Sequence, residues 1–166
     1  MNIQLEKVLA EQKQTLLNLL EKFNYEFSQY DHIILNDEGL YGYYHLDSYF
    51  TDPNREAFFI RVDDELAGFV MINNSPDSPR PIVYSIAEFF VVYRHRNRGV
   101  AQIVVDRLFA TRKGIWNIRF HPKNLVSVHL WTKIAKKYAG TRYEVIAGSE
   151  PYFDGSDSLV VLFQVR

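Results

Sequence analysis

The chain has 166 residues, of which 47% are hydrophobic and 23% charged, and this composition excludes a disordered or fibrous protein. The net charge of −1 argues against a general nucleic-acid-binding protein, and the absence of cysteine excludes disulfides, thiolate metal sites and a cysteine nucleophile. No segment resembles a signal peptide or a membrane span, so we expect one cytoplasmic, soluble domain over residues 1–166.

The N-terminal part of the chain predicts a strand and a long helix. Residues 2–8 alternate apolar and polar side chains closely enough for a short strand, although they could equally lead into a helix. An apolar stripe at helical spacing predicts an amphipathic helix from about residue 10 to residue 30, which should pack on a sheet. The stripe consists of Leu16, Leu20, Phe23 and Phe27.

An aromatic segment at residues 40–50 follows a stretch of turn-forming residues. It is either a short helix that covers the core, which we favour for most of its rings, or a wall that contacts a substrate. The candidates for substrate contact are Tyr41, Tyr43 and Tyr44, because every buried hydroxyl needs a hydrogen-bond partner.

A hairpin and an irregular loop come next. Residues 57–62 and 66–72 are rich in apolar side chains and are separated by a tight turn, which predicts two antiparallel strands. Residues 73–81 contain three prolines and two serines, so an exposed loop is predicted there.

The most informative stretch is a strand, a basic turn and a helix in direct succession. Aromatic and β-branched residues at 89–93 predict a buried strand, and helical spacing of apolar residues predicts a helix over about 99–112. The turn carries Arg94, Arg96 and Arg98. A glycine at the helix start lets the backbone approach a ligand, and the free N–H groups of the first turn attract an anion. This pattern predicts a phosphate or pyrophosphate site; an ordinary turn with solvated arginines is the alternative.

The last third of the chain predicts a second strand of a parallel pair. Residues 115–120 alternate as a strand and should pair in parallel with the preceding strand through a right-handed crossover. His95 and His121 should therefore lie near the same edge of the sheet. The remaining elements are a helix at about residues 123–138 and strands near residues 142–147 and 158–165.

Two motifs carry a resemblance to the GNAT superfamily of acyl-CoA-dependent N-acetyltransferases. The turn Arg96-Asn-Arg-Gly99-Val-Ala101 matches the family's pyrophosphate pattern, Arg/Gln-x-x-Gly-x-Gly/Ala, and Asn124 with Trp131 match the family's second helix motif. The segment Glu88-Phe-Phe-Val91 resembles a bacterial subgroup of uncharacterised, predicted acetyltransferases. The resemblance implies an α+β fold: a central mixed, mostly antiparallel sheet of about seven strands, with a splayed parallel central pair and about four flanking helices.

The resemblance also implies a coenzyme site. Backbone N–H groups of the turn would bind the pyrophosphate of acetyl-CoA, and Arg96 would add charge. The pantetheine arm would follow Phe90 and Val91, and the N–H of Val91 could stabilise the developing oxyanion. The remaining implied coenzyme contacts are Arg98, Gly99, Val100, Ala101, Asn124 and Trp131.

The chemistry implied by the resemblance centres on Glu88. This carboxylate is the general base that deprotonates the amine, or a structural carboxylate paired with arginine, or a ligand of the substrate ammonium. Trp131 stands where many family members have a tyrosine that protonates the leaving thiolate, so the general acid is another group, water or unnecessary. No histidine shows metal-binding spacing, and no metal is expected.

We therefore expect an N-acetyltransferase that uses acetyl-CoA and a small amine acceptor by direct attack in a ternary complex. The expected partners are these two molecules, with a homodimer allowed and with no nucleic acid or membrane. A non-catalytic acyl-CoA sensor is the alternative that the missing tyrosine permits. A nucleic-acid contact at Arg94–Arg98 is a third reading, which salt-sensitive binding of RNA or DNA would support.

Overall fold

Seven strands form one mixed sheet in the order β1-β2-β3-β4-β5-β7-β6 in the computed structural model, which describes residues 1–166. The strands are β1 (Ile3–Lys7), β2 (Glu56–Val62), β3 (Glu65–Asn73), β4 (Tyr84–Val91), β5 (Gly114–Phe120), β6 (Glu144–Ala147) and β7 (Leu159–Val165). The helices are α1 (Lys13–Asp31), α2 (Ser48–Thr51), α3 (Val100–Thr111) and α4 (Leu125–Ala139), with short 3₁₀ turns at Ala10–Gln12 and Tyr93–His95. The α+β class and the expected order of elements are confirmed.

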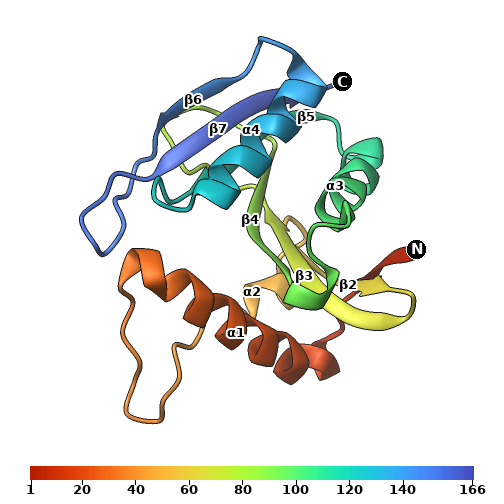
Figure 1. Ribbon diagram of the computed structural model, residues 1–166, viewed down its shortest axis with the longest axis vertical. Helices are drawn as coiled ribbons and strands as arrows, with labels where there is room; N and C mark the ends of the chain where they lie inside the picture. Colours follow the sequence, from red (N-terminus) through yellow and green to blue (C-terminus); the bar gives the residue numbers. More distant parts are fainter.

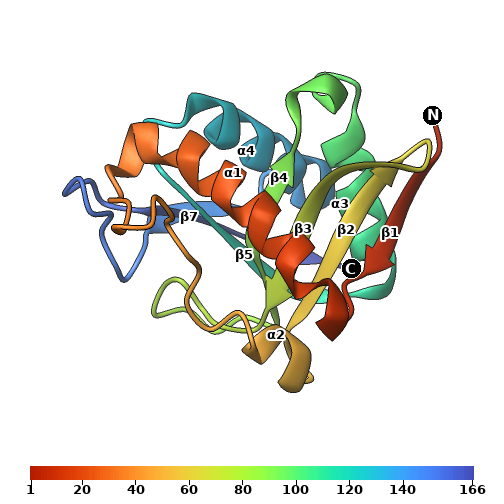
Figure 2. The same ribbon diagram turned by 90° about the horizontal axis from the view of Figure 1, so that it is seen from below.

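Helices cover both faces of this sheet (Figures 1 and 2). Helix α1 lies on one face, where buried residues such as Leu16, Leu20 and Phe59 form a hydrophobic cluster. Helices α3 and α4 lie on the other face over a larger cluster that includes Val104 and Trp116. Because each fully buried side chain of this kind contributes roughly 1.5–3 kcal/mol, the two clusters hold the helices firmly on the sheet.

The sheet opens between β4 and β5, its only parallel pair. Pairing between these strands covers only Tyr84–Ile86 against Trp116–Ile118, although both strands continue beyond it. On the other edge of β4, Ile72 of β3 pairs with Ile86 while Met71 pairs with Glu88, so Ala87 forms a β-bulge. A bulge bends its strand and increases its twist. This bend turns the end of β4 away from β5, and the expected splayed pair is confirmed.

The boundaries of β4 differ from the prediction. The strand begins at Tyr84 rather than at Phe89. The small residues Ser85 and Ala87 give residues 84–88 little strand signal in the sequence, and pairing with β3 and β5 makes this segment extended. It ends at Val91, and Tyr93 belongs to a 3₁₀ turn. None of the helices combines the length and the apolarity that crossing a membrane requires.

Candidate active site

Two connected cavities occupy the gap between β4 and β5. The α3 cavity, of about 580 Å³, lies at the N-terminus of α3, and the Glu88 cavity, of about 380 Å³, lies under the C-terminal half of α1. Both volumes are typical of small-molecule sites. The residues that line both cavities are Phe23, Phe27, Phe89, Asn124 and Ser127. These shared walls make one cleft with two ends.

The backbone of Gly99 opens the α3 cavity. Gly99 caps α3 in the left-handed conformation, with φ of 77°, and a Cβ added there would meet no protein atom within 4 Å. The first residues of the helix, Val100, Ala101 and Gln102, line the same cavity. Their N–H groups have no partner within the helix, so the cavity presents the positive end of the helix dipole to any anion. The predicted anion site thus has the expected strand-turn-helix frame.

Val91 directs its peptide groups into the gap. Val92 donates its N–H to the carbonyl oxygen of Ala67 at 2.8 Å. Because alternate residues of an antiparallel strand bond to the same neighbour, the N–H and C=O of Val91 face away from β3. The carbonyl accepts a hydrogen bond of 2.6 Å from Nε of Arg96. The N–H is left facing the cleft, as an oxyanion donor requires.

A glycine that sequence reasoning missed keeps β3 and β4 in close contact here. A Cβ on Gly68 would lie 1.9 Å from the carbonyl oxygen of Phe90 and 3.0 Å from Cα of Val91. Only glycine allows this approach. The only signal in the sequence is a glycine inside a strand pattern.

The side chains of the two arginines of the motif lie in different surroundings. Arg96 donates to both carboxylate oxygens of Glu26 on α1, at 2.6 and 2.7 Å, so its charge is compensated within the protein. Arg98 is exposed, and its Nη1 lies 3.3 Å from Nδ1 of His95. The structure therefore brings Arg96 to the wall of the α3 cavity and leaves the Arg98 side chain outside both cavities.

The start of α4 closes the cleft on the β5 side. Oδ1 of Asn124 accepts the backbone N–H of Ser127 at 3.1 Å and caps the helix. Trp131 is buried and packs edge-to-face on Phe89, with ring centroids 5.4 Å apart. Tyr138 is hydrogen-bonded to Asp106 of α3 and lines neither cavity, in agreement with a structural role.

Glu88 is the central group of the second cavity. The residue is half-buried and lines the cavity, and burial raises its pKa to about 8 against the opposing effect of a hydrogen bond from Tyr43. The hydroxyl of Tyr43 donates to Oε1 of Glu88 at 3.3 Å. A carboxyl group with such a pKa exchanges protons near neutral pH, which suits general acid–base chemistry.

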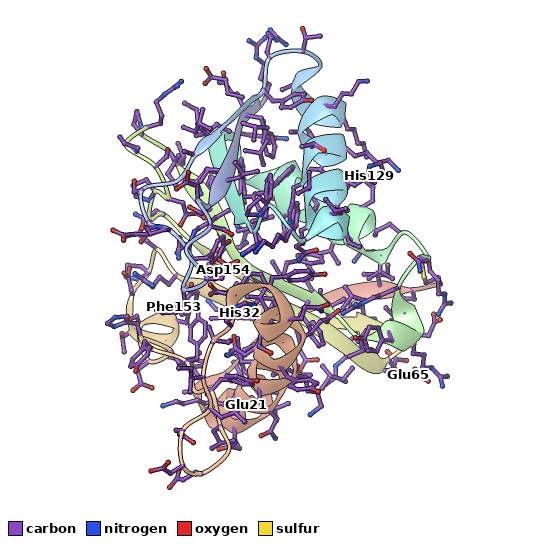
Figure 3. The ribbon with its side chains drawn as sticks, turned by 60° about the vertical axis from the view of Figure 1, so that its left-hand side comes forward. Glu21, His32, Glu65, His129, Phe153 and Asp154 are labelled. Atoms are coloured by element: carbon purple, nitrogen blue, oxygen red, sulfur yellow. The ribbon has the colours of Figure 1, made fainter.

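Of the three predicted substrate-contacting tyrosines, only Tyr43 lines the Glu88 cavity. Tyr41 is half-buried outside it, and Tyr44 is exposed to 89%. Glu21 of α1 positions this segment, because its carboxylate accepts the N–H of Tyr41 at 2.9 Å and that of Gly42 at 2.7 Å. Glu21 is half-buried on α1, and no sequence signal marked it (Figure 3).

The far wall of the Glu88 cavity is polar and was not predicted. Asp77 accepts hydrogen bonds from Ser85 at 3.3 Å and from Asn117 at 2.8 Å, and burial raises its pKa. Arg119 of β5 reaches the same wall and stacks on Tyr152, with Cζ 4.2 Å from the ring centroid. Asp77 lies in the predicted proline-rich loop, and Asn117 and Arg119 lie in the predicted strand at residues 115–120. The sequence does not show that these segments come into contact, because the contact depends on the tertiary structure.

The loop between β6 and β7 covers this wall. Phe153 donates its N–H to Oδ1 of Asp31 at 2.6 Å, and this bond fastens the loop to the end of α1. Figure 3 shows Phe153 and Asp154 of the loop near His32, the residue that follows α1. His121 is fully buried, and its Nε2 lies 3.1 Å from Oδ2 of Asp154 without hydrogen-bond alignment.

The two histidines expected at one sheet edge do follow the carboxyl ends of the parallel strands. They lie on opposite sides of the gap, since His95 contacts Glu65 and His121 contacts Asp154. No group of three His, Asp or Glu side chains is arranged to hold a metal ion.

A family model described as "Acetyltransferase (GNAT) family" matches residues 14–135, which include both cavities' walls on α1, β4, α3 and the start of α4. No protein with curated annotation matches the sequence.

Solved structures share the fold at low sequence identity. A Streptococcus agalactiae GNAT-family acetyltransferase has a TM-score of 0.71 at 15% identity, with 99% of this chain and 96% of that chain covered. A Thermus thermophilus acetyltransferase has a TM-score of 0.67 at 13% identity, with coverage of 99% and 98%. Spermidine N-acetyltransferase from Vibrio cholerae, in complex with CoA and spermine, has a TM-score of 0.62 at 12% identity, with coverage of 98% and 95%.

Proposed function

The chain belongs to the acetyltransferase (GNAT) family, and from this we propose that it transfers the acetyl group of acetyl-CoA to a primary amine of a small molecule. The observation that carries the proposal is a pair of adjoining cavities with shared walls, one at the anion-attracting start of α3 and the other around the carboxyl of Glu88. A cytoplasmic location, with acetyl-CoA as cosubstrate, is part of the same proposal.

The residues of the α3 cavity fit a coenzyme. The backbone N–H groups of Gly99, Val100 and Ala101 would bind the pyrophosphate, since Gly99 leaves open space above the helix start. The free N–H of Val91, with the side chain of Phe90 beside it in the cavity wall, would hold the pantetheine arm. Acetyl-CoA supplies an activated acetyl thioester, and the chain's own groups orient it, exclude water and accept the proton.

Glu88 would receive the amine proton. With a pKa of about 8, roughly a tenth of the Glu88 carboxyls are ionised at pH 7, and each is a stronger base than a carboxylate in water. The amine then attacks the thioester carbonyl directly, and the N–H of Val91 stabilises the negative charge that develops on the carbonyl oxygen. Without cysteine in the chain, no thiol acyl-enzyme can form.

Proton delivery to the departing thiolate needs no tyrosine in this scheme. Trp131 donates only through an indole N–H, which does not transfer a proton. The thiolate of the coenzyme can leave unprotonated, because a thiol is a much stronger acid than an alcohol. The same residue favours the second candidate, a sensor that binds acyl-CoA without turnover.

The chemistry of a structural neighbour supports an amine acceptor. The Vibrio cholerae protein acts on spermidine and was solved with spermine. From this neighbour we infer only that the acceptor of the present chain reacts through a primary amine. Asn124, which lines both cavities, would complete the coenzyme side of the cleft. Trp131, which lines the Glu88 cavity, would contact the acetyl end of the coenzyme, and Tyr43 the acceptor.

The test combines binding with turnover. Acetyl-CoA should raise the melting temperature of the protein, and an amine panel of amino acids, polyamines, aminoglycosides and peptides should include an acceptor that releases free thiol. Thermal stabilisation without thiol release from any amine would identify the sensor instead. An unchanged melting curve at saturating acetyl-CoA would refute both candidates.

A further inference from the structure

The guanidinium of Arg119 on β5 is the only cationic group that lines the Glu88 cavity, and it has no part in the reaction above. Nη2 donates to the carbonyl oxygens of Glu150 and Pro151, at 3.1 and 3.5 Å, and the Tyr152 ring covers one face. Nε is buried and has no hydrogen-bond partner. Buried donors are almost always satisfied, and Nη1 also makes no hydrogen bond within the protein while it is not enclosed, so this guanidinium is a candidate for binding a ligand.

None of the three carboxylates of the cavity forms an ion pair with Arg119, although its charge opposes the rise that burial causes in the pKa of Asp77 and of Glu88. Asp77 is bonded to Ser85 and Asn117, and Asp31 accepts the N–H of Phe153. Glu88 accepts a single hydrogen bond, from Tyr43. The cavity is thus left with one under-satisfied anion, Glu88, and one under-satisfied cation, Arg119.

These two groups face each other across the splay. Ile86 pairs with Ile118, and Glu88 and Arg119 lie just beyond that last parallel pair on neighbouring strands. Both side chains line the same cavity on the α1 face. Paired strands are about 4.8 Å apart, and the gap widens from there. A ligand that reaches both groups needs opposite charges only a few bonds apart.

We propose that the acceptor is a small zwitterionic amine of the amino-acid class, with its amine at Glu88 and its carboxylate on the free N–H groups of Arg119. This inference rests on the proposed acetyl transfer. Arginine binds carboxylates with fixed, charge-assisted hydrogen bonds, so it recognises this group better than a lysine would. The cavity of about 380 Å³ accommodates a molecule of this size.

The test compares matched acceptors that differ only in the anionic group. Glycine, β-alanine and leucine are each assayed against the corresponding amide and the corresponding amine without carboxylate, with thiol release as readout. At least one free acid should exceed its two neutral analogues about tenfold or more in kcat/KM, the range expected for a charged hydrogen bond. Arg119→Met should remove this preference, and Arg119→Lys should retain part of it.

Arg142→Met, at an exposed site outside both cavities, is the control and should keep the preference. Neutral amines that react as well as their acids would overturn the inference while leaving acetyl transfer intact. An equal loss for acids and neutral amines in Arg119→Met would likewise assign Arg119 a structural role. The absence of thiol release from every amine would overturn the proposed function, and this inference with it.

Discussion

Glu26 holds Arg96 by two parallel hydrogen bonds, of 2.6 and 2.7 Å, beside the α3 cavity. A third bond from Arg96 to the carbonyl oxygen of Val91 ties this pair to the end of β4. The side chains are only 28% and 30% exposed, so the pair is partly desolvated. The contact therefore acts as a strut that fixes α1 against the end of β4, where the N–H of Val91 faces the cleft.

A double-mutant cycle measures the coupling energy between Glu26 and Arg96. Glu26→Gln and Arg96→Met should each destabilise the fold, and their coupling energy should be about 1–2 kcal/mol, as for a bidentate, partly buried pair. Urea denaturation of the wild type, both single variants and the double variant provides the values. The control is the exposed pair Arg80–Glu144, at 2.8 Å, whose coupling should stay below about 1 kcal/mol. Equal coupling in the two cycles would contradict a special role of the strut.

Gly68 allows a second prediction. In Gly68→Ala, the added Cβ would collide with the carbonyl oxygen of Phe90, so β3 and β4 must move apart. We expect a loss of about 1–3 kcal/mol of stability, the usual cost of overpacking. Stabilisation by acetyl-CoA should also be lost, because Val91 shifts. Melting curves with and without acetyl-CoA test both effects.

Gly39→Ala is the control for Gly68→Ala. Gly39 has a φ of 75° and no protein atom near its added Cβ. This variant should show backbone strain of about 1–2 kcal/mol and still respond to acetyl-CoA. A coenzyme response that survives in Gly68→Ala would show that the close approach is not needed for binding.

Local sequence patterns predicted the strands and helix starts that build the site, but they did not predict the contacts between its side chains. The turn at Gly99 and the cap at Asn124 are short-range features, because their spacing along the chain places them at helix starts. The partners of Arg96 and Arg119 come from α1 and from the β6–β7 loop, far away in sequence. An arginine pattern shows available charge, but only the folded chain decides whether a carboxylate compensates it.

Gly99→Val tests the anion site. Valine would meet no protein atom at its Cβ but would enter the space above the helix start, where the pyrophosphate is proposed to bind. We expect the thermal shift with acetyl-CoA to disappear. Gly39→Val has a similar φ, 75° against 77°, and should lose comparable stability while keeping the shift. A preserved shift in Gly99→Val would place the coenzyme elsewhere.

Glu88 should make stability depend on pH. Its folded-state pKa of about 8 lies above the ordinary 4.5, so ionisation opposes folding: the penalty is absent below pH 4.5, grows between 4.5 and 8 and is complete above 8. Glu88→Gln removes it. We expect the variant to gain about 1–2 kcal/mol over the wild type between pH 5 and 8.5, less than full linkage because cavity water screens the charge. A pH-independent difference in urea denaturation would refute the raised pKa.

We expect the pKa of Glu88, which the hydrogen bond from Tyr43 lowers, to set the pH dependence of activity. The base must be ionised, so turnover should rise with pH through an inflection near 8. Tyr43 favours the ionised form, and Tyr43→Phe should therefore move this inflection to higher pH. The exposed Tyr44 gives the matched control, because Tyr44→Phe should leave the inflection in place.

Assays with two acceptors whose amines have different pKa values distinguish the ionisation of Glu88 from the ionisation of the amine. An inflection caused by the amine moves with the acceptor, whereas one caused by Glu88 does not. An inflection that stays fixed in Tyr43→Phe but moves with the acceptor would assign the proton to the amine and exclude Glu88 as the titrating base.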